Sequence, residues 1–353
     1  MSEKKKEPMP RKRVLLIVLC AILAVVLVAL IVGTAYIESI FGMINRFDPD
    51  ATLDTMSESE YNEMLKQEEQ DPNFTGPEID PDEVIWGSDV QLHQGENIIN
   101  ILLIGQDRRP GETRTRSDAM ILCTINKEKK TLTMTSFMRD MYVQIPGYKD
   151  NRINASYAFG GMQLLNKCLN KNFGVQIDGN VEVDFTGFQR VIDTLGGLDI
   201  ELTAAEAQYL NRRGNWDIED NAGEWSLKAG VNRLNGSQAV AFSRIRNVGN
   251  GDFGRTNRQR VVLSTLLERM MTMNASEVKG LLDEILPLLT TDLSNAEIMG
   301  YAMELFPLLT SLEISTQQIP AEGAYRMASI DGMSVLLPDL KKNVAILEEI
   351  MKD

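Results

Sequence analysis

A run of 24 residues without a charged side chain, from Val14 to Ile37, is the feature that most constrains this chain. Most of these residues are Leu, Val, Ile or Ala. At about 1.5 Å per residue, a helix of this length crosses a hydrocarbon core about 30 Å thick. A cleaved signal peptide is the alternative, with small residues at 33–35, but its apolar region usually has only about 7–15 residues. The sequence therefore predicts an uncleaved transmembrane helix at 14–37.

The charges on the two sides of this run predict its orientation. Residues 1–37 carry a net charge of +4, and residues 38–95 carry −13. Because Lys and Arg favour the cytoplasmic side, we expect residues 1–13 to be a cytoplasmic tail and everything after Glu38 to be extracellular. Residues 38–95 hold several prolines among the acids and are predicted to form an extended acidic linker, of which 56–67 alone is compatible with a helix.

The remainder, residues 96–353, is expected to be one globular domain with a net charge of −5. This acidity argues against nucleic acid as a partner. The single histidine, His93, precedes the domain, which excludes histidine-based triads and histidine-rich metal sites. The cysteines, at positions 20, 123 and 168, form no CxxC pair, which excludes zinc fingers and thioredoxin-like chemistry. A disulfide between Cys123 and Cys168 stays open on sequence alone.

Strand-like and helix-like segments alternate through this domain. Short apolar or alternating runs predict strands at 98–104, 119–126, 132–136, 141–145, 181–185, 198–202 and 312–319. Periodic segments predict helices at 154–170, 186–195, 255–273 and 338–351, and capping residues predict further helices after Asn235 and Ser294. This order predicts an α/β domain with a central mixed β-sheet and helices on both faces.

Arginines gather in the loops that follow the predicted strands. One group lies between Asp107 and Asp118, Arg139 follows the third strand, and a third group lies at 244–260. Residues 244–260 carry a net charge of +4 within an acidic domain. Every basic residue in these groups is Arg, whose planar fork binds phosphate oxygens in pairs, as Lys cannot. The carboxylates of Asp107 and Asp118 beside these arginines favour a site for Mg²⁺ or Mn²⁺, held by the carboxylates and by substrate oxygens. Ion pairing between Asp and Arg alone is the alternative.

Seven motifs follow one another in a recognisable order. They are Asn100–Asp107, Arg116–Met120, Ser136–Asp140, Arg152–Gly161, Val183–Phe188, Asp193–Gly197 and Leu234 through Gln259. Together they resemble the LytR–CpsA–Psr family of Gram-positive cell-wall enzymes over roughly residues 97–270. This sequence departs from the family pattern at two places, and both departures are small. Gln106 stands where the family commonly has Ser or Thr, and Phe137-Met138 replaces the usual Ile-Pro before Arg139.

The resemblance implies a membrane-anchored extracellular phosphotransferase of a Gram-positive envelope. Members of the family transfer a glycopolymer, such as wall teichoic acid or capsule, from a polyprenyl-pyrophosphate carrier to peptidoglycan. Membrane lipid is a further implied partner, because the polyprenyl tail enters an apolar cleft.

The resemblance also assigns residues. Asp107 and Asp118 would hold Mg²⁺ (or Mn²⁺), and both would be catalytic together with Arg139 and Asp252. The residues implied to bind the pyrophosphate are Arg139, Arg244, Arg246, Arg255, Arg258 and Gln259. Asp118 and Asp252 stay unranked as the general base. Arg260 is expected off the site, since two residues turn it about 200° from Arg258 around a helix.

Other functions are compatible with the same residues. A polyprenyl-pyrophosphate pyrophosphatase would use water as the acceptor, and a non-catalytic protein would only bind lipid pyrophosphate or wall polymer. Carboxylates weaken plain anion binding, so Asp107 and Asp118 favour an enzyme over a binder. A DNA-binding regulator is disfavoured, because the basic groups are predicted outside the cell and the cytoplasmic tail has only 13 residues.

Overall fold

The computed structural model describes residues 38–47, 56–67, 76–86, 94–106, 117–212 and 225–352. The chain forms two compact units, residues 1–44 and 45–353, and the second unit contains the central sheet. Among the described residues, no helix has the length and apolar character needed to cross a membrane. The transmembrane helix predicted at 14–37 lies outside the described residues.

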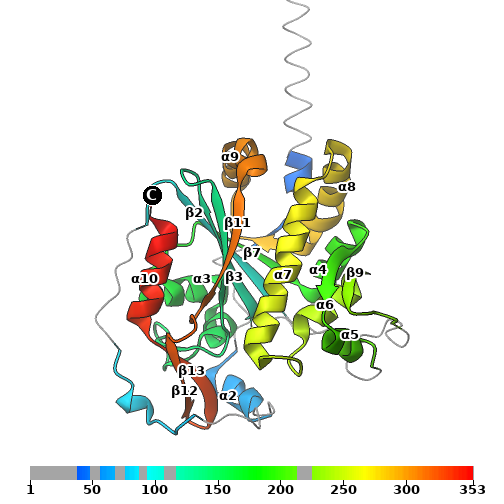
Figure 1. Ribbon diagram of the computed structural model, residues 1–353. Helices are drawn as coiled ribbons and strands as arrows, with labels where there is room; N and C mark the ends of the chain where they lie inside the picture. Colours follow the sequence, from blue (N-terminus) through cyan, green and yellow to red (C-terminus); the bar gives the residue numbers. More distant parts are fainter. Residues whose placement is uncertain are drawn as a thin grey trace, which may run out of the picture. The chain divides into compact units, whose positions relative to one another are not determined.

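A seven-stranded mixed sheet forms the centre of the second unit (Figure 1). In spatial order its strands are β1 (Asn45–Arg46), β10 (Leu289–Thr291), β7 (Gly179–Asp184), β2 (Ile98–Gln106), β3 (Ser117–Asn126), β4 (Thr131–Phe137) and β11 (Glu313–Ile319). Strands β2, β3 and β4 pair antiparallel, whereas β7 pairs parallel with β2 and β11 pairs parallel with β4. The predicted mixed sheet is confirmed.

Helices cover both faces of this sheet, as predicted (Figure 1). The helices on one face are α3 (Ile153–Phe173) and α10 (Leu340–Met351), and those on the other are α4 (Phe185–Thr194), α6 (Gly236–Arg244), α7 (Gly251–Met271) and α8 (Ala275–Ile285). Successive side chains of a strand point to opposite faces, so Leu122 of β3 packs with α3 and Cys123 packs with α7. Cys123 and Cys168 are both buried and free, so they form no disulfide.

Smaller elements surround the sheet. They are α2 (Glu58–Gln67), η1 (Pro81–Glu83), β5 (Tyr142–Val143), β6 (Asn151–Arg152), β8 (Leu198–Leu202), α5 (Ala204–Leu210), β9 (Gly230–Leu234), η3 (Leu286–Leu288), α9 (Asn295–Leu305), η4 (Phe306–Ser311), β12 (Tyr325–Ile330) and β13 (Met333–Pro338). The capping residues predicted from sequence are in place: Asn235 accepts from Gln238 N at 2.9 Å, and Ser294 accepts from Glu297 N at 3.2 Å.

Parts of the predicted acidic linker belong to the fold. Strand β1 adds to the edge of the sheet, and α2 inserts Tyr61 into the core, where this side chain is fully buried. Its hydroxyl donates to Asn154 Oδ1 at 2.9 Å, and its ring meets Phe159 edge-on at 5.2 Å. Residues 77–86 run beside β12, with Ile79 N donating to Ser329 O at 2.8 Å. An extended spacer is therefore not what these stretches form, because Tyr61 and Val84 are buried in the fold, although Ile85 stays exposed.

Replacing Tyr61 by Ala is expected to lower the free energy of unfolding by about 3 kcal/mol, since removing a buried aromatic side chain typically costs roughly 3–5 kcal/mol. Urea unfolding of the purified protein measures this change. The control is Glu63→Ala, at an exposed position of the same helix, for which we expect a change within about 0.5 kcal/mol. Equal, small changes for both variants would mean that α2 contributes nothing to the folded domain.

Candidate active site

Asp118 and Arg139 meet at one end of the sheet because of how β3 and β4 pair. Asp118 is the second residue of β3, and Arg139 lies two residues after the end of β4. The two strands are antiparallel, so the beginning of β3 lies beside the end of β4. Arg139 Nη1 donates to Asp118 Oδ1 at 2.7 Å, and the side chains are 5% and 18% exposed. A predicted metal ligand and a predicted pyrophosphate ligand thus form a largely buried ion pair.

A second pair of arginines lies around the first turn of α7. Arg255 Nη2 lies 3.1 Å from Asp252 Oδ1, and Arg246 Nε lies 3.5 Å from the same oxygen. Arg255 is buried, whereas Arg246 is exposed. Burial, followed by the repulsive charge of Arg139, lowers the pKa of Arg255 to about 10. The charge of Arg139 therefore acts on Arg255, although the two residues come from opposite halves of the domain sequence.

Asp140 joins the two groups. Arg139 Nε lies 3.6 Å from one of its carboxylate oxygens, and Arg152 Nη1 lies 3.4 Å from the other. Burial acts to raise the pKa of Asp140, but the charges of four guanidinium groups outweigh burial and hold this pKa below its ordinary value. These four, Arg139, Arg152, Arg246 and Arg255, are termed the arginine cluster.

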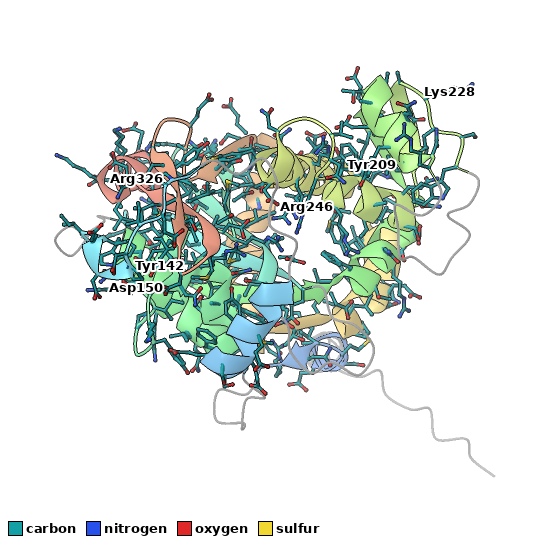
Figure 2. All side chains as sticks on the ribbon, turned by 90° about the horizontal axis from the view of Figure 1, so that it is seen from below. Tyr142, Asp150, Tyr209, Lys228, Arg246 and Arg326 are labelled. Carbon is teal, nitrogen blue, oxygen red and sulfur yellow. The ribbon has the colours of Figure 1, made fainter. Side chains whose placement is uncertain are left out.

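The arginine cluster has a buried donor to which a further anion could bind. Among the described residues, its four guanidinium groups are ion-paired with three carboxylates, those of Asp118, Asp140 and Asp252. The Nε of Arg255 is buried and has no hydrogen-bond partner among the residues that the structure describes. A buried donor without an acceptor is costly, and phosphate oxygens provide acceptors in the geometry that suits Arg. In Figure 2, Arg246 lies between Arg326 of β12 and Tyr209 of α5, viewed from the end at which α7 begins.

Arg258 contacts other groups than the arginine cluster does. Its Nε donates to Glu206 Oε1 at 2.7 Å, and its Nη1 and Nη2 donate to the carbonyls of Ile245 at 3.1 Å and Val248 at 2.7 Å. The side chain therefore fixes the segment that carries Arg246 to helix α5. In this structure Arg258 positions a neighbour of the site.

The other residues assigned from sequence are placed as follows. Arg244, at the end of α6, is exposed, and its guanidinium lies 5.0 Å from the centre of the Phe185 ring. Gln259 is half-buried one turn beyond Arg255. Asp107 lies outside the described residues, as do the arginines at 108–116. The assigned residues that the structure brings together are Asp118, Arg139, Arg246, Asp252 and Arg255.

Arg260 lies in an unexpected environment. The guanidinium is not on the solvent face of α7, because the residue is only 8% exposed. Its Nη2 donates to Asn257 Oδ1 at 3.3 Å, and its burial lowers the pKa of this group. Arg260 is therefore a buried position of α7.

A buried polar chain that sequence reasoning missed supports the end of β2, directly before Asp107. Gln106 Nε2 donates to the hydroxyl of Tyr157, which in turn donates to Glu182 of β7. All three side chains are buried. The sequence signal was the unusual Gln106, which follows an otherwise apolar strand and requires an internal partner.

Asp118 is able to hold a divalent cation in addition to its arginine. A carboxylate oxygen is a ligand that Mg²⁺ takes, and Arg139 holds one oxygen of Asp118 in a fixed position. Within the described ranges, no three His, Cys, Asp or Glu side chains gather closely enough to form a metal site by themselves. A cation here would therefore depend on Asp107 and on substrate oxygens, as Mg²⁺ does at sites with one or two carboxylates.

Fold and site together define an α/β protein with a cluster of arginines paired with aspartates at one end of a mixed sheet. The chain belongs to the LytR_cpsA_psr family, whose model matches residues 52–352. This match begins within the segment predicted as a linker and extends through α10.

Named relatives fall into two groups. The regulatory protein MsrR of Staphylococcus aureus (strain COL) is 36% identical over 189 residues, which are 52% of this chain and 54% of MsrR. The chain therefore spans about half the length of this relative. The polyisoprenyl-teichoic acid–peptidoglycan teichoic acid transferase TagT of Bacillus subtilis (strain 168) is 30% identical over 237 residues, which are 66% of this chain and 70% of TagT.

Solved structures of TagT share the fold. The structure of TagT bound to LI-WTA matches with a TM-score of 0.58 and 27% identity, covering 72% of this chain and 91% of that one. The structure of YwtF (TagT) with bound octaprenyl pyrophosphate lipid matches with a TM-score of 0.55 and 25% identity, covering 74% of this chain and 93% of that one.

Proposed function

We propose that this protein is a phosphotransferase that moves an anionic glycopolymer from a polyprenyl-pyrophosphate carrier to peptidoglycan. The arginine cluster carries the proposal, because its guanidinium groups are joined through shared aspartates and Arg is suited to binding the oxygens of a diphosphate. The transferase name of TagT and the octaprenyl pyrophosphate in a solved TagT structure support this class of substrate. Wall teichoic acid, capsule and other anionic glycans all fit the same site.

The reaction requires charge neutralisation and alignment more than covalent catalysis. A peptidoglycan hydroxyl attacks the phosphorus next to the glycan, the bond from this phosphorus to polyprenyl phosphate breaks, and polyprenyl phosphate leaves. Arg139 and Arg255 are buried and thus fixed in orientation, so they stabilise the charge on the transferred phosphoryl group without reorganisation. The hydroxyl proton goes to Asp118 or Asp252. Asp252 is the more open to an arriving acceptor, since its side chain is 35% exposed against 18%.

A divalent ion, Mg²⁺ or Mn²⁺, belongs to the proposal. Asp107 and Asp118 would hold it, together with oxygens of the diphosphate. When bound, it neutralises charge on those oxygens. Arg139 keeps Asp118 in place for this role through the 2.7 Å hydrogen bond.

Membrane anchoring through residues 14–37 with an extracellular domain is also part of the proposal. Alkaline phosphatase fused after Asp353 is expected to be active in intact cells, since this enzyme matures only outside the cytoplasm, and the mature chain is expected to retain Lys4. A fusion with green fluorescent protein at the same position is the complementary control. It is expected not to fluoresce, because the fused protein is exported in unfolded form. A soluble secreted product that begins near Tyr36 would contradict the anchor.

The products distinguish this function from its two alternatives. The full chain is incubated with a lipid-pyrophosphate-linked glycan, with and without peptidoglycan oligomers. A transferase consumes the glycan donor only when peptidoglycan is present and forms a conjugate. Equal release of free sugar phosphate without peptidoglycan would identify a pyrophosphatase, and binding without consumption would identify a binding protein.

A further inference from the structure

We propose that one end of the domain lies against the outer surface of the membrane as an apolar interfacial face. This face consists of α9 and the adjoining parts of α7 and α8, and is termed the bilayer face. The inference rests on the proposed anchor at 14–37 and assigns a docking surface beyond it. Figure 1 shows α8, α9 and the C-terminal end of α7 at the same end of the domain.

Apolar side chains are exposed on all three helices of the bilayer face. Met303 of α9 is 72% exposed, Met271 at the end of α7 is 40% exposed, and Val278 of α8 is 38% exposed. Helix α9 has no buried residue, although Ile298, Met299, Tyr301 and Leu305 are among its eleven residues. These four side chains are half-buried, so the helix packs only partly on the domain and leaves apolar area, above all Met303, open to a further partner.

Four of the five acids of α8 and α9 form ion pairs within the domain, which weakens their opposition to contact with a bilayer; Glu297 is the exception and is only hydrogen-bonded. The acids of α8 form ion pairs: Glu277 with Arg269 at 3.8 Å, Asp283 with Lys279 at 2.7 Å and Glu284 with Arg190 at 3.6 Å. In α9, Glu304 pairs with Lys127 at 2.6 Å, and Glu297 accepts from the Ser294 backbone N–H at 2.8 Å. The face thus offers apolar contact with little uncompensated charge, so a lipid surface suits it through burial of apolar area.

The length of the preceding chain brings this end close to the membrane. Asn45 follows Ile37, the last residue of the predicted anchor, by eight positions. Eight residues reach at most about 29 Å when fully extended. The side chain of Arg46 donates to the Leu293 carbonyl and to Asn295, the first residue of α9. The beginning of α9 is therefore tethered to the bilayer by this span plus one residue and the length of the Arg46 side chain.

Helix α7 then sets the distance of the active site from the membrane. Its C-terminal end contributes Met271 to the bilayer face, and its first turns carry Asp252 and Arg255. With 21 residues, the helix is about 32 Å long. With the bilayer face docked, the arginine cluster opens on the peptidoglycan side, so the lipid carrier has to be drawn partly out of the bilayer to reach it.

The test compares two positions of equal exposure in the full chain reconstituted into nanodiscs. Met303 and Val231 are each 72% exposed, and Val231 lies in β9, away from the bilayer face. Each is replaced by Cys in a Cys20→Ala background and labelled with an environment-sensitive fluorophore. The native thiols stay unlabelled, since burial raises the pKa of both Cys123 and Cys168 to about 12.

We expect lipids with a spin label near the headgroup to quench the Met303→Cys probe several-fold more than the Val231→Cys probe. Equal quenching at the two positions would overturn the proposal. A fluorescence signal at Met303→Cys that indicates burial only when a nanodisc holds more than one chain would also overturn it. The bilayer face would then be covered by a second copy of the protein. The experiment involves no turnover, so equal quenching would contradict the bilayer face and leave the transferase proposal intact. Selective quenching in a protein without transferase activity would contradict only the transferase proposal.

Discussion

Replacing Arg139 by Lys is expected to reduce glycan transfer by on the order of 10²-fold. Lys keeps the positive charge but loses the planar fork that pairs with phosphate oxygens and with Asp118. Hydrogen bonds to charged groups contribute roughly 1.5–3 kcal/mol each, and about 1.4 kcal/mol corresponds to tenfold in rate. Transfer rates and lipid-pyrophosphate binding, both at fixed ionic strength, check the expectation.

Arg233→Lys is the matched control for this change. Arg233 lies on the exposed strand β9 and pairs with Asp199 at 2.8 Å, with both side chains about half exposed. Exposed pairs contribute only about 0–1 kcal/mol, so transfer is expected to stay within about twofold. If Arg139→Lys, Arg255→Lys and Arg233→Lys all had the same small effect, the arginine cluster would act only as a diffuse positive field, and the residue assignments would be wrong.

Replacing Asp118 by Asn is expected to lower both divalent-ion binding and turnover, the latter by on the order of 10²-fold or more, because a carboxylate beside a metal-bridged diphosphate stabilises the transition state. The fold should stay intact, since Asn has nearly the same shape and can still accept from Arg139. Mn²⁺ binding, thermal unfolding and transfer rate are measured on the same preparation.

Asp199→Asn, in an exposed ion pair, serves as the control for Asp118→Asn and should change neither Mn²⁺ binding nor turnover. The competing view holds that Asp118 only orients Arg139. Under that view, the wild-type protein would keep full activity in a strong chelator, and Asp118→Asn would bind Mn²⁺ as the wild type does. Either result would remove the metal from the proposed mechanism.

The main sheet and its helices were predictable from sequence, whereas the elements at its margins were not. Buried strands such as β2 and long periodic helices such as α7 have patterns that local sequence determines. The β12–β13 hairpin was missed, although its turn contains Asp331-Gly332, both with positive φ, which is typical of a two-residue hairpin loop. The acidity of residues 56–67 and 76–86 favours a spacer, with a helix at 56–67 as the one compatible element, because single buried side chains such as Tyr61 leave no periodic pattern.

The site was predictable where strand ends bring residues together. Asp118 and Arg139 flank two successive antiparallel strands, so their meeting follows from topology alone. The roles of Arg258 and Arg260 could not be predicted in the same way. Arg258 donates to Glu206, an acid distant in sequence whose position depends on how α5 packs. The burial of Arg260 depends on the elements that pack against α7. Helical spacing gives the angle between two side chains, but not which side faces the core.

The central claim, transfer of a glycan phosphate to peptidoglycan, is tested most directly by following the donor phosphorus into the products. A donor labelled at the phosphorus next to the glycan is incubated with the full chain and peptidoglycan oligomers, and the products are identified by mass. The account predicts that this labelled phosphorus links glycan to peptidoglycan in a single phosphodiester, that one polyprenyl phosphate is released per conjugate, and that Arg139→Lys slows both products equally. Recovery of the label as free sugar phosphate in the presence of peptidoglycan, at a rate equal to donor consumption, would contradict it.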